Sequence, residues 1–498
     1  RNQRLQGDPE SQQTSSLMIQ HRFSATTFQK RTPLSLSQWA SLLALLAFVV
    51  SLVSFACIPA QKVLLVVLGL YALILSWYWP LPVLVVAMIL STTVFQLVSL
   101  EHLPYLQLTG DTRLNALDVC ILVSFCTGLL RMIQRKRIPL FLLPLAAIIG
   151  AMLLALLVGV IRGTTSLSSG LNGMRAVSGF LFYFCLAGNI TARRQLKWII
   201  FCVFLFMLVS VGIQGYEYLK GQRLITPFVS SNAYWSTTKW IRIGNEQVPY
   251  LWNRAPLFLA LGFFMAWGAL LSRYKTWLNA LLFAAAYIGY FITLTRSWYV
   301  LIAVGLAASL MFSARRPASL FKGLLIAMLL LFLVGISLVI FNQVGLDLKS
   351  VWWSRVSTIL DYQNEATFQI RIMASQKMWQ LFLKSPFSGH GPGSGFYNTD
   401  LGMWNSLVEY GALGWLAVMY LGAAVLRRLL ALIQTTAEGS REHGYALGLL
   451  GLWIGLYVLY FFSIDPFFYT SLSIGVGVLL AVCEKMPLLA GERRFSTT

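Results

Sequence analysis

Charged residues are scarce in this chain. They make up 11% of its 498 residues, less than half of the roughly 25% usual for soluble domains. Hydrophobic residues make up 57% of the chain, and a spanning helix takes about 20 residues, so this apolar supply would fill on the order of 14 spans. The composition excludes soluble globular, disordered and disulfide-scaffold proteins, and it indicates a membrane protein.

Histidine and cysteine are also rare. The four histidines exclude a multi-histidine metal site. The six cysteines lie in or beside apolar runs without CxxC spacing, which favours buried small side chains over metal or redox chemistry. We therefore expect no metal site.

Acidic residues are fewer than half as frequent as basic ones, 17 against 38, and the formal net charge is +21. In a soluble protein this excess would suggest nucleic acid. Here most basic residues fall in short gaps between apolar runs, where they act as topology signals. We therefore expect these basic residues to lie beside a lipid bilayer, and we expect no nucleic-acid partner.

Fourteen apolar segments predict an all-α polytopic membrane domain over residues 36–487, between a polar tail at 1–35 and a short tail at 488–498. Basic gaps follow the even-numbered segments, so the positive-inside rule predicts that both termini are cytoplasmic. The long gaps 219–253 and 343–404 are then external. The predicted spans are 38–57, 61–79, 81–99, 117–131, 138–161, 177–191, 198–218, 254–272, 277–295, 297–314, 319–342, 405–430, 444–464 and 467–484.

The 343–404 loop is the longest stretch without a span, and a loop of this length is usually functional. Its segment from 366 to 384 predicts an amphipathic helix whose apolar stripe consists of Phe368, Ile372, Trp379 and Phe382. A glycine-rich turn follows Pro386. Because the stripe needs an apolar surface to cover, we expect this loop to pack over the external face.

Arg296 lies in FITLTRSWYVLIAVG, among apolar residues on both sides. An arginine there costs several kcal/mol unless it is paired or hydrated, so a functional role is the default interpretation. Its planar fork suits phosphate oxygens. The alternative is snorkelling of the side chain to the interface.

The glycine-rich turn has no GK[ST] sequence, so it resembles a phosphate-binding P-loop only superficially. A tight turn that lets the backbone approach a ligand fits better. His390 in this turn is either a hydrogen-bonded turn residue or a proton acceptor. Asp400 precedes the next span, where it is either a functional carboxylate or an ordinary helix cap.

Further basic residues persist in the external gaps, against the topology bias. Solvated surface and anion binding are both open for them. They include Arg175, Arg242, Arg254, Arg371 and Lys377.

Three stretches resemble the O-antigen ligase and O-antigen polymerase (Wzy) superfamily of polytopic membrane glycosyltransferases. LTRSWYVLIAVGL is similar to its (T/S)xxRxxxL segment. FQIRIMASQKMWQLFLKSPFSGHGPGSG is similar to its arginine, tryptophan and glycine pattern in the large periplasmic loop, and DLGMWNSLVEYGALGW is similar to its (H/D)N…E-x-G-x-x-G segment. Together they cover about 120 residues.

The resemblance implies a GT-C-type fold in the bacterial inner membrane and an inverting, metal-independent transfer without cofactors. The donor would be a glycan on undecaprenyl pyrophosphate, transferred on the periplasmic face to a glycan acceptor. The resemblance assigns Arg296 and Arg371 to the pyrophosphate, with Arg175, Arg242, Arg254 and Lys377 as further candidates for donor binding. A chain-length regulator and a flippase are the partners that such a polymerase would have.

Asp400 stands where ligases carry the histidine that activates the acceptor. This departure favours a polymerase over a ligase that transfers glycan to lipid A-core, and it leaves the base open between Asp400 and His390. An alternative of another class is a secondary transporter for an anion such as bicarbonate, because fourteen spans also suit a carrier. Carriers have repeats and paired broken helices, and no repeat is apparent here.

Overall fold

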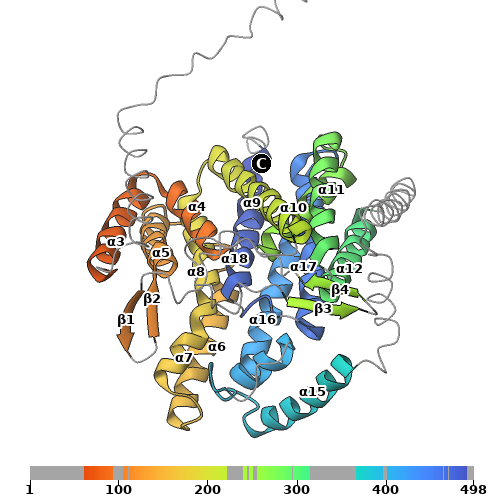
Figure 1. Cartoon of the computed structure of the whole chain (residues 1–498). Coiled ribbons are helices and arrows are strands. Elements are labelled where there is room, and N and C mark those ends of the chain that lie inside the picture. The colour runs from red at the N-terminus through yellow and green to blue at the C-terminus, as the bar shows by residue number, and fades with distance from the viewer. Residues whose placement is uncertain are drawn as a thin grey trace, which may run out of the picture.

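The computed structural model describes residues 61–92, 105–109, 112–220, 239–243, 246–250, 255–293, 295–313, 366–395, 401–463, 465–468 and 470–490. Within these ranges the chain is mostly helical (Figure 1). The helices are α3 (Gln61–Tyr78), α4 (Pro80–Ser91), α5 (Ala116–Gln134), α6 (Leu142–Ile161), α7 (Leu167–Gly173), the 3-10 helix η1 (Met174–Ala176), α8 (Val177–Asn189), α9 (Arg193–Lys220), α10 (Pro256–Leu271), α11 (Thr276–Thr293), α12 (Arg296–Ser313), α15 (Ala366–Lys384), α16 (Gly402–Thr435), α17 (Arg441–Phe462), α18 (Thr470–Lys485) and α19 (Pro487–Ala490).

Six of these helices, α5, α6, α9, α11, α16 and α17, are long and apolar enough to cross a membrane. The chain is therefore a helical membrane protein. Each predicted apolar segment that falls within the described residues corresponds to a helix, although α4 ends at Ser91 and is shorter than the 81–99 segment. The predicted segments 38–57 and 319–342 lie outside the described residues, so the fourteen-span count remains a prediction.

Two short antiparallel hairpins add to the predicted helices in the described part of the chain. They join β1 (Tyr105–Thr109) to β2 (Thr112–Asn115) and β3 (Lys239–Ile243) to β4 (Glu246–Tyr250). In the second hairpin Ile243 pairs with Glu246, so two residues connect the strands. Their sequence is Gly-Asn, a pair typical of two-residue hairpin turns. The hairpins lie in gaps between apolar helices, where hydropathy alone gives no signal.

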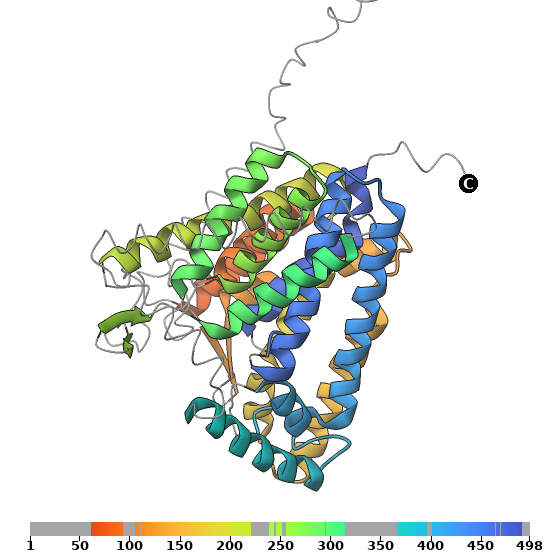
Figure 2. The same cartoon turned by 90° about the vertical axis from the view of Figure 1, so that its right-hand side faces the viewer.

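The helices run between two ends of one bundle (Figures 1 and 2). At one end lie the turns 134–142, 189–193, 271–276 and 435–441 and the end of α18; we call it the basic end, because arginines or lysines lie in or beside each of these turns. At the other, the α15 end, lie α7, α15 and the turn between α17 and α18. The compartment that each end faces remains a prediction.

The centre of the bundle is α10, which packs against α17, α11 and α9. Its residues from Pro256 to Ala269 are all buried. Glycines on α17 allow this close packing: a Cβ on Gly448 would lie 1.8 Å from the Phe264 carbonyl oxygen, and one on Gly451 would lie 2.2 Å from the Gly305 oxygen of α12. Such spacing of small residues is typical of helix contacts in membranes.

α16 is broken at Gly411, whose φ of 66° and ψ of −170° lie outside the helical region. The break leaves the Val408 and Glu409 carbonyls without their helical partners. The glycine-rich turn supplies replacements, because the His390 N–H donates to the Val408 oxygen at 2.8 Å and the Gly391 N–H donates to the Glu409 oxygen at 3.0 Å.

The same turn also accepts hydrogen bonds from the amides beyond the break. The Ala412 N–H donates to the Pro386 carbonyl at 2.8 Å, and the Leu413 N–H donates to the Phe387 carbonyl at 3.2 Å. Two helical hydrogen bonds are thus exchanged for four bonds to the turn. Irregular backbone is tolerated at membrane depth only where its polar groups are satisfied inside the protein, and the turn meets this condition.

We predict that Gly411→Ala destabilises the protein strongly. A Cβ at this position would lie 2.3 Å from the Phe387 carbonyl oxygen, and the backbone conformation is one that only glycine adopts readily. We expect a loss of more than about 2 kcal/mol, measured as thermal unfolding in detergent. The matched control is Gly150→Ala in α6, where a Cβ meets nothing within 4 Å and helix propensity favours alanine. Equal behaviour of the two variants would contradict the packing at the break.

Candidate active site at the α15 end

The three stretches that carry the resemblance lie at the same end of the bundle. α12 begins there with Arg296, α15 lies across this end, and the first turns of α16 pack against α15 (Figures 1 and 2). They come from distant parts of the sequence. Of the three, α15 and α16 are in direct contact, and the start of α12 lies toward the same end of the bundle.

α15 begins at Ala366 and ends at Lys384, as predicted. The predicted stripe is wrong in detail. Ile372 is 43% exposed and Trp379 is 47% exposed, whereas Met378 is only 1% exposed. α15 packs on the first turns of α16, where the rings of Trp379 and Trp404 lie 6.0 Å apart, and its most buried apolar side chain is that of Met378, outside the predicted stripe.

The glycine-rich turn also forms hydrogen bonds with α7 and with the residues that follow α6. The hydroxyl of Thr164 donates to the His390 carbonyl at 2.6 Å, and that of Ser169 donates to the Gly393 carbonyl at 2.7 Å. Gly389, Gly391, Gly393 and Gly395 all have positive φ. The first three of these glycines let the turn approach α16, α6 and α7 closely, and the approach of a ligand to this backbone remains a prediction.

His390 is 6% exposed. Its Nε2 lies 2.9 Å from the Leu381 carbonyl oxygen, and since a carbonyl only accepts, Nε2 carries the proton and donates. The ring therefore ties the turn to the last part of α15. Of the two roles left open for His390, this geometry favours the hydrogen-bonded turn residue.

Two carboxyl groups lie close together beside the break. Glu409, in the first turns of α16, interacts with the Gly393 N–H and the Tyr410 hydroxyl, and its charge is repelled by that of Asp465. The rings of Tyr410 and Phe468 lie 4.6 Å apart, which joins α16 to the turn that carries Asp465.

Asp465 lies in the turn between α17 and α18. Its Oδ1 accepts the Phe467 and Phe468 N–H groups, each at 3.0 Å, and its Oδ2 accepts the Ser406 hydroxyl at 3.1 Å. Burial raises the pKa of this carboxyl to about 7, although the hydrogen bonds oppose the rise. A carboxyl that titrates near neutrality can donate or accept a proton.

Sequence reasoning missed Asp465. The available signal was a lone aspartate in SIDPFF, between two apolar spans, because an ionisable residue at such a place is a functional candidate by default. Glu409 was noted only as part of the E-x-G pattern, and its nearness to Asp465 depends on the packing of α16 against α17, which periodicity does not reveal.

The other predicted residues have different placements. Arg371 is partly buried on α15, on the same side of the helix as Met378, and Lys377 is exposed on the same helix. Arg175 forms an ion pair with Asp118 at 2.6 Å, so its charge is balanced at the start of α5. Arg242 lies in β3, whereas Asp400, Arg254 and the side chain of Arg296 lie outside the described residues.

Within the described ranges, no group of three or more His, Cys, Asp or Glu residues could hold a metal ion. No protein-family model matches this chain, and no curated protein matches it either.

We predict that Asp465 makes stability depend on pH. Its pKa is about 7 in the folded protein against a usual value of 3.8, so the folded state binds this proton more tightly. The contribution to stability is therefore greatest below about pH 4, and it is lost as the pH rises through 7. Asp465→Asn keeps an oxygen acceptor for the two N–H groups and should reduce the difference between unfolding midpoints at pH 5 and pH 8 by a few degrees.

The control for this experiment is Glu438→Gln, an exposed acidic residue in the turn between α16 and α17. It should leave the pH dependence unchanged. If Asp465→Asn keeps the full difference between pH 5 and pH 8, another group is responsible.

Proposed function

We propose that this protein is a membrane glycosyltransferase that polymerises glycan repeat units carried on undecaprenyl pyrophosphate, with its active site at the α15 end. The observation that carries the proposal is that α15 with its glycine-rich turn, the first turns of α16 and the start of α12 lie at one end of the bundle. These are the segments that resemble the superfamily. A lipid-linked donor also requires a site that borders a bilayer, which suits the end of a helical membrane bundle.

The proposed reaction breaks the bond between an anomeric carbon and the pyrophosphate. Negative charge grows on the leaving oxygen, and positioned arginines stabilise that charge. One such contact contributes about 10²–10³ in rate. We assign this role to Arg296 and Arg371, because a guanidinium matches phosphate oxygens in two-pronged geometry.

The acceptor hydroxyl attacks the anomeric carbon from the opposite face, which inverts the centre. Its proton passes to a carboxylate or imidazole within hydrogen-bond reach, for about 10²–10⁴ in rate. We assign the base to Asp400. His390 is assigned as a positioning residue, because its Nε2 is engaged with the Leu381 carbonyl. Asp465 and Glu409 are candidates to relay the proton, since one carboxyl of such a pair is readily protonated near neutrality.

The break in α16 bears on the transporter alternative, because carriers bind substrates at the ends of broken helices. Such sites need exposed backbone N–H or carbonyl groups. Here the Val408 and Glu409 carbonyls and the Ala412 and Leu413 amides are all engaged with the turn, so the break does not offer a carrier site of this kind. Purified protein in liposomes separates the two: polymer formation from lipid-linked glycan supports our proposal, and anion uptake without polymer contradicts it. Transfer to lipid A-core without polymer would identify the ligase alternative.

We predict that Arg371→Ala abolishes polymer formation and that Arg371→Lys restores little of it, because lysine lacks the planar fork. The measurement is turnover of purified lipid-linked glycan at matched membrane levels. The matched control is Lys384→Ala, an exposed cation at the end of the same helix, which should keep most of the activity. Full activity of Arg371→Lys would show that a point charge is sufficient.

We predict opposite outcomes for the two candidate bases. Asp400→Asn should remove polymer formation and leave donor binding intact, because only the proton acceptor is lost. His390→Gln should keep substantial turnover, because the glutamine amide can still donate to the Leu381 carbonyl. An inactive, correctly folded His390→Gln beside an active Asp400→Asn would reverse the assignment.

A further inference from the structure

A cavity of about 310 Å³ opens at the basic end, among residues of the turn 134–142 and of the ends of α8 and α18. It lies where α5, α8 and α18 end and where the chain turns into α6. Its polar lining consists of Arg131, Arg135, Arg137, Thr191, Glu484 and Lys485. Four cations thus face one carboxylate.

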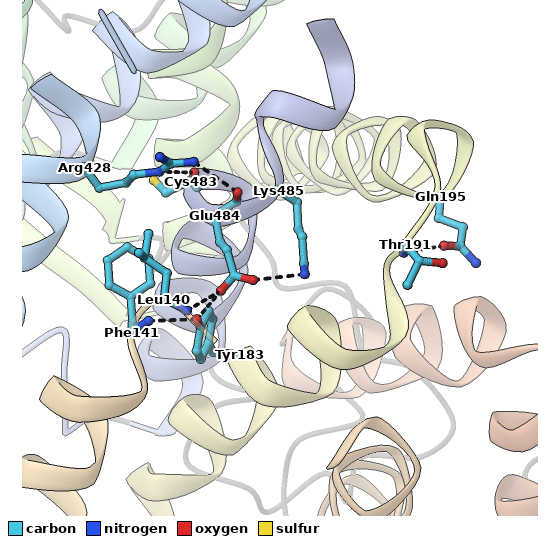
Figure 3. A network of polar contacts seen from close by, with 9 residues as sticks. All are labelled: Leu140, Phe141, Tyr183, Thr191, Gln195, Arg428, Cys483, Glu484 and Lys485. Carbon is cyan, nitrogen blue, oxygen red and sulfur yellow. Dashed lines mark hydrogen bonds and ion pairs between the residues drawn. The ribbon is translucent and has the colours of Figure 1, made fainter. Parts of the chain in front are cut away.

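The single carboxylate is already engaged. Glu484 accepts the Leu140 N–H at 3.1 Å and the Tyr183 hydroxyl, and it pairs with the Lys485 ammonium at 2.9 Å (Figure 3). One Glu–Lys pair is therefore neutral, and the three arginines carry an excess of positive charge into the cavity.

The arginines find no compensating anion in the part of the chain that the structure describes. Arg131 donates to the Asn189 side chain at 2.5 Å and to the Trp77 carbonyl, which are neutral acceptors that hold its guanidinium in place. Arg135 and Arg137 are exposed, and no carboxylate among the described residues lies within ion-pair distance of them. The cavity therefore carries positive charge that the described carboxylates do not balance.

The surroundings of the cavity indicate what kind of anion it suits. Ile138 lines the cavity and is 82% exposed, and Ile133 on α5 is 65% exposed. Exposed apolar side chains beside a basic cavity suit contact with lipid chains. Basic cavities between such helices suit phosphate-bearing lipid headgroups, and arginine pairs with phosphate oxygens in two-pronged geometry.

We propose that this cavity binds the phosphate headgroup of an anionic phospholipid, with Arg135 and Arg137 on the phosphate and the acyl chains against Ile133 and Ile138. Arg131 and the Glu484–Lys485 pair form its fixed wall. The site is distinct from the proposed active site and does not depend on the proposed function.

The test is thermal unfolding of the purified full chain in detergent, titrated with phosphatidylglycerol, with phosphatidylcholine, or with inorganic phosphate. Phosphatidylglycerol should raise the unfolding midpoint by several degrees and phosphatidylcholine should not. Arg135→Gln combined with Arg137→Gln should weaken the apparent affinity for phosphatidylglycerol about thirty-fold, since each basic residue near a lipid surface contributes about five-fold.

The matched control is Arg273→Gln combined with Lys275→Gln, two exposed cations at the same end that do not line the cavity. This variant should bind phosphatidylglycerol within about threefold of the parent protein. Both double variants should unfold at the parent midpoint in phosphatidylcholine, which shows that they fold. Equal loss in both variants, or equal stabilisation by the two lipids, would overturn the site. Stabilisation by inorganic phosphate at the affinity of the lipid would overturn the assignment to a headgroup.

Discussion

Backbone hydrogen bonding across the break in α16 fixes the geometry of the α15 end. A helix that is interrupted near the membrane exposes amides and carbonyls whose desolvation costs several kcal/mol each. The turn after α15 supplies two donors and two acceptors at the required positions. The break and the turn are therefore joined by hydrogen bonds into one structural unit.

The proposed site depends on this unit in several ways. The Glu409 carbonyl accepts a hydrogen bond from the turn, while its carboxylate stays on the side where Asp465 lies. His390 ties the turn back to α15, which carries Arg371. Ser385, where α15 ends, accepts the Arg162 guanidinium at 2.6 Å, so α6 is joined to the same assembly. The arginine that we assign to the donor and the two buried carboxyl groups are thus set by one rigid connection.

Much of the helical framework could be predicted from hydropathy alone. An apolar run of spanning length satisfies its backbone hydrogen bonds in a membrane by forming a helix. The bounds of α15 could be predicted because Pro386 and the glycines after it end the helix. The buried face of α15 could not be predicted, because packing against the first turns of α16 determines it. This face includes Arg371 as well as Met378. The β3–β4 hairpin carried a turn signal in its Gly-Asn pair, but apolar periodicity does not detect it.

The constellation of site residues was only partly predictable. His390 and Arg371 were found from their motifs, whereas Asp465 comes from a turn that no motif covers. The pairing of Arg175 with Asp118 joins residues from different helices, and nothing in either local sequence indicates it. Such contacts arise from packing between distant segments, so the structure is needed to separate arginines with a local carboxylate partner from those that can meet a ligand.

Hydrogen–deuterium exchange of single backbone amides in lipid nanodiscs tests the central claim most directly. If the turn fills the break, the amides of His390, Gly391, Ala412 and Leu413 should exchange as slowly as those in the continuous part of α16, because all four donate to backbone carbonyls across the break. Rapid exchange at Ala412 and Leu413, with the rest of α16 protected, would show that the break is open and would contradict this account of the site.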